Sequence, residues 1–400
     1  MRISILGLLL MLTNVRSLTG KIEGVHAFYY LWYGDRSHDG QYKHWNHEVL
    51  PHWEDRVNKM YSNIGNAYSP PENLHSPYYP LNGPYSTRNK TQLLVHLKDM
   101  ESFGIQVAVV SWWGQASKSY TTDTQGVSTD LILNELLQVV EESGIPISIA
   151  FHLEPYPSRS AASVREDVGY IYDSYGNFKC LLRVDNKLVF YVYDSYYIKT
   201  FEWRQVLKED GPLTVRNTRL DSVFIGLWLN HEHGRDLAEG GFDGFYTYFS
   251  SINFSYGSNI DNWRYMCRYA KSKNMLCILS VGPGYNDEKI RPWNSHNTKD
   301  RKSGQYYIAM WKAAIAAGVK TVAITSYNEW GEGTQIEPAA SRGDVVSIAT
   351  RIRAEIGDVV NSVPTETYLD YEEPYFYLKL TAKYSKLLSG KSSSESIDEL

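Results

Sequence analysis

Three glutamates stand close together in residues 324–338, which read ITSYNEWGEGTQIEP. Glu329 and Glu332 enclose a tryptophan and a glycine, and Glu337 follows before a proline. Two carboxyl groups held near each other suit acid–base catalysis, because one can donate a proton while the other accepts one. A surface helix that carries acids for solubility would avoid glycine. We therefore interpret Glu329 and Glu332 as catalytic, against the alternative of a solvated loop pair, and expect Glu337 to be exposed or behind the site.

Aromatic side chains are the second chemical feature of the chain. Its 400 residues include 32 Tyr, 11 Trp and 12 Phe, which together make 14%. Tyr and Trp join a flat apolar face to a hydrogen-bonding tip, which suits sugar-binding clefts as well as large cores. Carboxylates beside such rings are typical of sites that cleave glycosidic bonds, where one acid protonates the leaving oxygen. The place of the rings in the fold decides between these two uses.

Eight short runs rich in β-branched and aromatic residues predict strands, because they are too short for typical helices. They span residues 25–33, 106–113, 145–154, 188–193, 223–229, 242–249, 276–281 and 321–327. Helical patterns lie between them, over residues 91–103, 130–143 and 305–317. A glycine follows each of these three patterns, and glycine accepts the left-handed conformation that often ends a helix. Eight strand–helix repeats predict an α/β fold, a (β/α)8 TIM barrel with insertions.

A doubly wound open sheet is the alternative fold, but no glycine-rich phosphate-binding sequence follows the first run. A long aromatic-rich loop follows instead, over residues 34–88, and it includes Trp45 and Trp53. A loop of this length in a compact domain is usually functional or disordered, and its aromatic content argues against disorder. We predict one catalytic domain over residues 22–380 and a polar tail over residues 381–400.

The C-terminal ends of barrel strands are where such folds build their active sites. These ends, and the segment after the seventh run, carry Tyr30, Trp32, Tyr33, Trp112, Trp113, His152, Glu154, Tyr193, Asp194, Tyr246, Tyr248, Tyr285, Arg291, Trp293 and Asn294. The N-terminal ends carry mostly Gly, Ile, Pro and Lys. This asymmetry favours a ligand-binding wall, on which sugar rings stack while Arg and Asn bind the hydroxyl groups.

Some of these residues have structural alternatives. Glu154 could pair with Arg291 rather than face a ligand, and His152, which alternates with Glu154, could be a hydrogen-bonded core histidine. In the first loop, histidines 44, 47 and 52 give only a weak metal signal, so we interpret them as sugar contacts or loop scaffolding. We expect no cofactor and no essential metal.

The net charge of −5 and the lack of a basic block argue against nucleic acid as a partner. Residues 1–17 have the outline of a signal peptide, with Arg2, an apolar segment and a small-residue cleavage pattern. The apolar run is too short for a typical membrane-spanning helix, so membrane attachment would need this segment to be retained as a short anchor. We expect the protein in the lumen of the secretory pathway, in the endoplasmic reticulum or Golgi, or secreted.

Two further features bear on this location, and the cysteines bear on stability. Asn89 and Asn253 begin N-glycosylation tripeptides, which fit a lumenal chain. The last four residues, Ile-Asp-Glu-Leu, share the final three residues of endoplasmic-reticulum retrieval signals but not the first. Cys180, Cys267 and Cys277 permit at most one internal disulfide, so stability must come from the core.

Several blocks of the chain resemble glycoside hydrolase family 99, whose eukaryotic members are endo-α-1,2-mannosidases. In order between residues 24 and 338, they read HAFYYLWYG, HWNHEVLPHW, FHLEPY, FYVYDSY, GFDGFYTYF, SVGPGYNDEKIRPWN and SYNEWGEGTQIEP. Weaker similarity continues in YLDYEEPYFYLKLTAKYS. The resemblance implies a metal-independent, retaining endo-hydrolase on a (β/α)8 barrel. Such an enzyme cleaves the α-1,2 bond behind a glucose-capped mannose on immature high-mannose N-glycans of glycoproteins.

The resemblance also implies residue roles. Glu329 would take the proton from the substrate 2-OH, which attacks C1 to give a 1,2-anhydro sugar, and Glu332 would protonate the leaving oxygen and then activate water. In the usual retaining scheme a carboxylate itself attacks the sugar carbon. The sugar-binding residues that match are Tyr248, Arg291 and Asn294 at the cleavage point, Glu154 nearby, and Tyr30, Tyr33 and Tyr193 as further contacts.

Two positions depart from the family pattern. Gly331 stands where the family segment commonly has histidine, which changes loop flexibility and removes a polar contact. Trp113, a distal-subsite residue, stands where vertebrate enzymes more often have tyrosine and bacterial mannan-cleaving members have tryptophan, so either glucose or mannose could be preferred there. An endo-α-1,2-mannanase is therefore an alternative. A lectin-like relative without turnover and a glycosyltransferase are rivals, but both acids are retained and no nucleotide-binding sequence is present.

Overall fold

The computed structural model describes residues 22–118, 122–123, 125–358 and 367–390. The predicted signal peptide and the last four residues, with their retrieval-like ending, lie outside these ranges. No helix among the described residues is both long enough and apolar enough to cross a membrane. The segments that support the targeting predictions are therefore known from sequence alone.

Eight parallel strands form a closed barrel. They are β1 (Gly24–Tyr29), β2 (Val107–Trp112), β3 (Ser148–Leu153), β5 (Lys187–Val192), β6 (Val223–Leu227), β7 (Gly244–Tyr246), β8 (Leu276–Val281) and β9 (Thr321–Ile324). β1 pairs with both β2 and β9, and pairing of β3 with β5 closes the circle. The short β4 (Arg183–Val184) pairs antiparallel with the start of β5. The predicted (β/α)8 barrel is confirmed.

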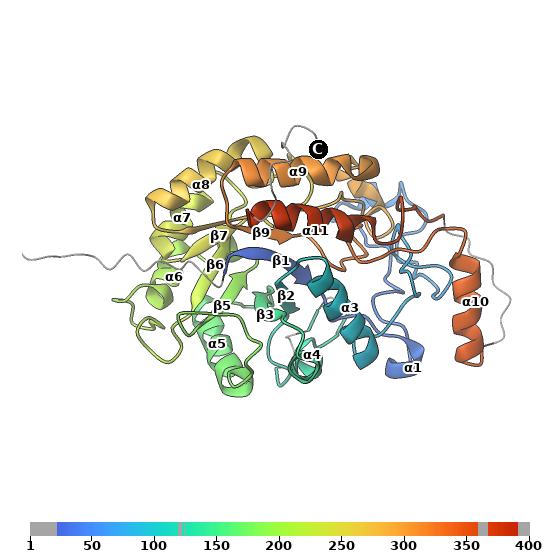
Figure 1. The fold of residues 1–400 in the computed structure, drawn as a ribbon, viewed down its shortest axis with the longest axis horizontal. Helices are drawn as coiled ribbons and strands as arrows, with labels where there is room; N and C mark the ends of the chain where they lie inside the picture. Colours follow the sequence, from blue (N-terminus) through green and yellow to red (C-terminus); the bar gives the residue numbers. More distant parts are fainter. Residues whose placement is uncertain (1–21, 119–121, 124, 359–366, 391–400) are drawn as a thin grey trace, which may run out of the picture.

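Helices surround the strands (Figure 1). Three of them, α3 (Lys90–Ser102), α4 (Asp130–Ser143) and α9 (Gln305–Ala316), begin and end within about one residue of the predicted segments. The others around the barrel are α5 (Ala161–Tyr175), α6 (Thr200–Leu207), α7 (His233–Gly240) and α8 (Trp263–Ser272), which have no individually predicted counterpart. Two of these have only eight residues, too few turns for a clear helical period.

The C-terminal helix α11 (Phe376–Leu388) packs on the outside of the barrel against α9. The rings of Tyr377 and Tyr307 lie 6.0 Å apart, and those of Tyr384 and Trp311 are stacked at 5.7 Å. The predicted domain boundary at residue 380 is therefore too early, because the second half of this helix buries aromatic surface. Polar residues separate the buried positions of this helix, so its second half was predicted to be part of a polar tail.

The long first loop, which contains α1 (Arg36–Asp39), lies at the end of the barrel toward which β1 points, together with α10 (Val345–Glu355) (Figure 1). It also contains the single-turn helix α2 (Asp55–Asn58). Trp45 anchors the loop, since its buried indole N–H donates to the Tyr85 carbonyl (2.7 Å) and its ring stacks on Tyr33 at 4.2 Å. The loop is thus an ordered cover over the C-terminal ends of the strands.

The barrel interior is filled by aromatic side chains. The ring of Phe28 lies 4.7 Å from that of His152, 5.6 Å from Tyr246 and 5.0 Å from Tyr248. Alternate residues of each barrel strand point inward, so rings from different strands meet on the axis. This packed layer forms the floor on which the C-terminal face is built.

One disulfide links a helix to a strand of the barrel in the part of the chain that the structure describes. Cys267 of α8 and Cys277 of β8 form a disulfide, with Cα atoms 5.3 Å apart, and Cys180 is a half-buried free thiol.

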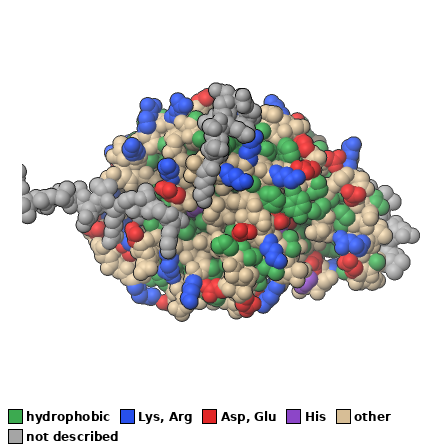
Figure 2. Space-filling model, viewed as in Figure 1, with side chains coloured by type: hydrophobic (Ala, Val, Ile, Leu, Met, Phe, Trp, Pro, Cys, Tyr) green, Lys and Arg blue, Asp and Glu red, His purple; other side chains and the backbone are tan. Residues whose placement is uncertain are grey.

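On the face in Figure 2, Lys and Arg side chains are interspersed with Asp and Glu side chains. The charge of this face is therefore mixed rather than gathered into one basic area.

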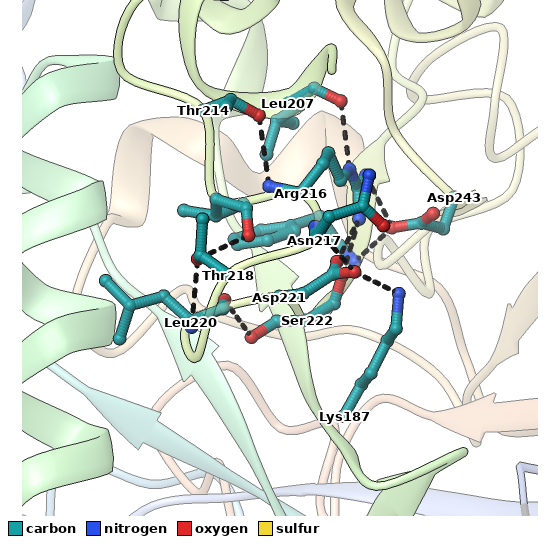
Figure 3. Close-up of polar contacts among 12 residues, drawn as sticks. Lys187, Leu207, Thr214, Arg216, Asn217, Thr218, Leu220, Asp221, Ser222 and Asp243 are labelled. Carbon is teal, nitrogen blue, oxygen red and sulfur yellow. Dashed lines mark hydrogen bonds and ion pairs between the residues drawn. The ribbon is translucent and has the colours of Figure 1, made fainter.

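A polar network joins the N-terminal ends of β5, β6 and β7, opposite the long loop (Figure 3). The Arg216 guanidinium lies 2.9 Å from Asp243 and 3.3 Å from Asp221, and it donates to three backbone carbonyl groups. Lys187, the first residue of β5, also pairs with Asp221. Arg216 thus connects the segments that precede β6 and β7, and Asp221 links them to β5 through Lys187.

Replacing Arg216 with methionine is expected to lower the free energy of unfolding by about 2–4 kcal/mol, because two carboxylates and three carbonyl groups lose a largely buried partner. Urea denaturation followed by circular dichroism measures the loss, and activity per folded molecule should not change. Arg219→Met is the matched control, since the side chains of Arg219 and Asp173 are 65% and 64% exposed and their ion pair should add little stability. Equal losses in the two variants would contradict this role for the network.

Candidate active site

A cavity of roughly 190 Å³ lies at the C-terminal ends of the strands, and both predicted catalytic acids line it. Its lining residues are Tyr30, Trp32, His44, His47, His75, Trp113, Glu154, Pro155, Tyr193, Tyr248, Ile290, Arg291, Glu329 and Glu332. Most of the predicted substrate-binding residues are among them, although they come from strands far apart in the sequence. The exceptions are Tyr33 and Asn294.

The two acids lie on a tight loop just after β9. The backbone N–H of Glu329 donates to Ser326 Oγ (2.7 Å), and the N–H of Gly331 donates to Glu329 Oε1 (3.0 Å). Behind the loop, the indole N–H of Trp330 donates to the Glu337 carboxylate (2.8 Å). The tryptophan between the acids is therefore a buried anchor, which fixes both carboxyl groups relative to the barrel.

Glu337 belongs to the support of this loop rather than to the cavity. It is buried, and its carboxylate also accepts from the Tyr85 hydroxyl (2.7 Å) and contacts His96 Nε2 at 2.9 Å. The other ring nitrogen of His96 contacts the Tyr29 hydroxyl at 2.8 Å. Of the two predicted places for Glu337, exposed or behind the site, the structure shows the second.

The acid pair has an unusual electrostatic setting. Burial raises the pKa of Glu329 well above its ordinary value, and the neighbouring Glu332 carboxylate raises this pKa further. Burial also raises the pKa of Glu332, while Arg291, with Nη1 3.5 Å from Glu332 Oε1, acts in the opposite direction. Carboxyl groups with raised pKa values can exchange protons with a ligand near neutral pH.

Arg291 is held in place from behind. Its Nη1 pairs with Asp287 Oδ2 at 3.0 Å, and Asp287 is fully buried. The same carboxylate accepts from Asn294 Nδ2 (2.9 Å) and from the Tyr285 hydroxyl (2.9 Å). Asn294, predicted to bind sugar, therefore does not line the cavity; it positions the aspartate that holds Arg291.

Glu154 lines the cavity and does not form the alternative pair with Arg291. Its Oε1 accepts from Ser111 Oγ (2.9 Å) and lies 2.8 Å from His152 Nδ1. The other ring nitrogen of His152 contacts the Tyr246 hydroxyl at 2.7 Å. His152 is thus a hydrogen-bonded core histidine, and it holds Glu154 at the edge of the barrel floor.

The predicted tyrosines divide into two groups. The hydroxyl groups of Tyr30 and Tyr248 hydrogen-bond each other in the cavity wall, and the ring of Tyr193 packs 4.8 Å from that of Tyr248. Tyr33 lies behind the wall, where its hydroxyl donates to the Asn328 carbonyl (2.9 Å). Tyr33 supports the loop that carries the acids.

The rest of the lining includes one predicted wall residue and several residues that had no assigned role. Trp32, predicted for the ligand-binding wall, lies between two predicted tyrosines, and its ring stacks on His44 at 4.3 Å. His44 and His47, left open between sugar contact and scaffold, both line the cavity, whereas His52 packs on Trp53. No group of three or more His, Cys, Asp or Glu among the described residues is arranged to hold a metal ion. Missed lining residues such as Pro155 and Ile290 carry no motif that could have revealed them.

Comparison with known proteins gives a consistent result. The chain matches the model of glycosyl hydrolase family 99 over residues 22–390. It is 37% identical over 382 residues to the glycoprotein endo-alpha-1,2-mannosidase of Rattus norvegicus, covering 94% of this chain and 77% of the relative. It is 38% identical over 369 residues to an endo-alpha-1,2-mannosidase-like protein of Mus musculus, covering 90% and 76%, respectively.

The solved structure of the GH99 endo-alpha-mannosidase from Bacteroides thetaiotaomicron has the same fold. The TM-score is 0.77 at 36% identity, and the match covers 93% of this chain and 99% of the bacterial one. The barrel, the acids on the loop after β9 and these similarities agree, and the protein is a glycoside hydrolase. The chain belongs to glycosyl hydrolase family 99.

Proposed function

We propose that this hydrolase is a retaining endo-α-1,2-mannosidase that releases glucose-capped mannose from immature high-mannose N-glycans. The observation that supports this most directly is that Glu329 and Glu332 share one loop and one cavity with Arg291. The relatives named as glycoprotein endo-alpha-1,2-mannosidases support the same class of substrate. The aromatic walls from Tyr30, Trp113 and the other rings of the lining suit sugar faces.

In the first step, ionised Glu329 removes the proton of the substrate 2-OH, and that oxygen attacks C1. The bond between C1 and the leaving oxygen breaks while Glu332 gives its proton to that oxygen, so a 1,2-anhydro sugar forms. Burial of Glu329 supports its role as base, because the raised pKa increases its affinity for the proton. Arg291 stabilises the negative charge that Glu332 acquires.

In the second step, ionised Glu332 removes a proton from water, whose oxygen attacks C1 and opens the three-membered ring. The 2-oxygen takes back its proton from Glu329, so both acids return to their starting states. Each step inverts C1, and two inversions retain the configuration of the sugar. The cycle needs only two carboxyl groups and a cation beside one of them, which this cavity supplies.

Mass spectrometry of the products from monoglucosylated and unglucosylated high-mannose glycans tests the proposal. We expect a glucosyl-mannose disaccharide from the first glycan, released faster than any product of the second. Faster cleavage of the unglucosylated glycan would instead favour the mannanase alternative, with Trp113 in the wall. Binding without release would favour a lectin-like protein. Failure to cut either glycan would contradict the enzymatic proposal.

We also propose a lumenal place in the secretory pathway. Asn253, in the second glycosylation tripeptide, is exposed on the loop after β7. Asn89 is half-buried, and its side-chain oxygen accepts from the Thr91 N–H (3.0 Å) at the start of α3. We therefore expect a glycan more readily at Asn253 than at Asn89.

A further inference from the structure

His75, a residue of the first loop, lies in the cavity wall with an unusual imidazole. Its exposed fraction is only 2%. Its Nδ1 is buried and makes no hydrogen bond of normal geometry among the described residues, although the ring contacts the Trp45 backbone. Burying a polar atom without a full hydrogen bond costs free energy. The ring lines the cavity without a side-chain partner among the described residues, so its Nε2 can meet a ligand that enters there.

The ring of His75 also covers Gly331. A Cβ atom on residue 331 would lie 2.9 Å from both Cδ2 and Nε2 of His75, and 2.5 Å from Ile290 Cδ1. These contacts are too short for real atoms, so residue 331 must be glycine as long as His75 and Ile290 keep these positions. Since Gly331 separates the two acids, the Cδ2–Nε2 edge of the imidazole lies against the catalytic loop itself.

The charge state of the ring suits a hydroxyl group. Burial lowers the pKa of His75 well below its ordinary value, and His47 and His44 lower it further. The neutral imidazole has one donor and one acceptor nitrogen, and a sugar hydroxyl can serve either. A neutral ring also adds no positive charge that would weaken the affinity of Glu329 for its proton.

Other polar atoms of the wall also lack hydrogen bonds of normal geometry. The indole nitrogen of Trp113 is likewise buried without a hydrogen-bond partner among the described residues, and its ring lines the same cavity. The indole of Trp32, also in the wall, contacts the Tyr33 hydroxyl without a bond of normal geometry. They are suited to a ligand with several hydroxyl groups.

We propose that His75 binds a hydroxyl group of the sugar at the cleavage point, from the space above Gly331 that a side chain at that position would otherwise fill. His75 is thus a substrate-binding residue supplied by the first loop instead of by the catalytic loop. The proposal rests on the proposed function, because it requires a sugar ring beside Glu329 and Glu332.

Two substitutions separate the hydrogen bond from the packing. His75→Phe keeps a flat ring but no ring nitrogen, whereas His75→Gln keeps an amide near the position of Nε2. Each is made in Glu332→Gln protein, so that binding of a monoglucosylated high-mannose oligosaccharide can be measured by calorimetry without turnover. We expect Phe to weaken binding about five- to tenfold, the effect of one neutral hydrogen bond, and Gln to retain most of the affinity.

A double substitution tests the relation to Gly331. In an Ile290→Ala background, which removes the other short contact at residue 331, adding Gly331→His to His75→Gly returns an imidazole to the same space from the catalytic loop. It should recover most of the affinity that His75→Gly loses in that background. Thermal denaturation confirms that each variant is folded. Unchanged affinity in His75→Phe, or no recovery in the double variant, would overturn the role of His75. If the parent protein bound no glycan and wild-type enzyme cut none, the proposed function itself would fail.

Discussion

Replacing Glu332 with glutamine is expected to lower kcat on a high-mannose glycan by about 10³-fold while the Kd of the glycan changes little. Glutamine has the size of glutamate but cannot give a proton to the leaving oxygen or take one from water. Burial already favours the protonated, uncharged form of Glu332, so the amide should disturb the cavity little. The loss should therefore appear in turnover rather than in binding.

A substrate with a good leaving group distinguishes the two acids. A glycosyl fluoride needs little proton donation to leave, so Glu332→Gln should form the anhydro sugar from it at nearly the wild-type rate, as a burst before slow hydrolysis. Glu329→Gln should show no burst with fluoride or glycan, because the 2-OH must still lose its proton. Stopped-flow measurement of fluoride release gives both results. Equal behaviour of the two variants would contradict the separate roles.

Stability provides an independent check on the same pair. The pKa of Glu329 is raised in the folded protein, so folding is favoured while the group is protonated, and this advantage is lost as the pH rises toward the folded-state pKa. Glu329→Gln should therefore raise the Tm more at pH 8 than at pH 4. Glu288→Gln, an exposed change on the loop after β8, should alter neither Tm nor kcat and serves as the control.

The barrel was predictable because strands of a closed barrel are buried on both sides and read as continuous apolar runs. The strand ends were harder. The runs that contain β1 and β9 continue through Tyr33 and Tyr327, yet these strands end at Tyr29 and Ile324. The residues beyond remain buried under the first loop, so their apolar character does not distinguish a strand from a covered turn.

The site was predictable where position in the barrel decides it. Residues at strand ends such as Tyr248 and Glu154 converge by topology, and they line the cavity as expected. Site residues on long loops could not be predicted, because no local pattern shows which loop side chains point into the cavity. His75 was missed for that reason, and the Asn294 side chain reaches the Arg291 guanidinium through Asp287, a link that the sequence does not show.

Arg291→Met is expected to lower kcat/KM at neutral pH by about 10²-fold, the second large effect at this site. The guanidinium lowers the pKa of both Glu329 and Glu332, and methionine has similar length but no charge. Without Arg291 both pKa values should rise. Glu329 would then become an ionised base only at higher pH, so the acidic limb of the kcat/KM profile should move to higher pH.

Arg291→Lys separates charge from contact. Lysine keeps the positive charge near Glu332 but loses the planar guanidinium that pairs with both Asp287 and Glu332. We expect the lysine variant to lose affinity while its pH profile stays close to that of the wild type, and the methionine variant to change in both respects. Profiles of kcat/KM between pH 4 and pH 9 measure the difference. Coincident profiles of the methionine variant and the wild type would show that Arg291 binds sugar without setting the proton affinity of the acids.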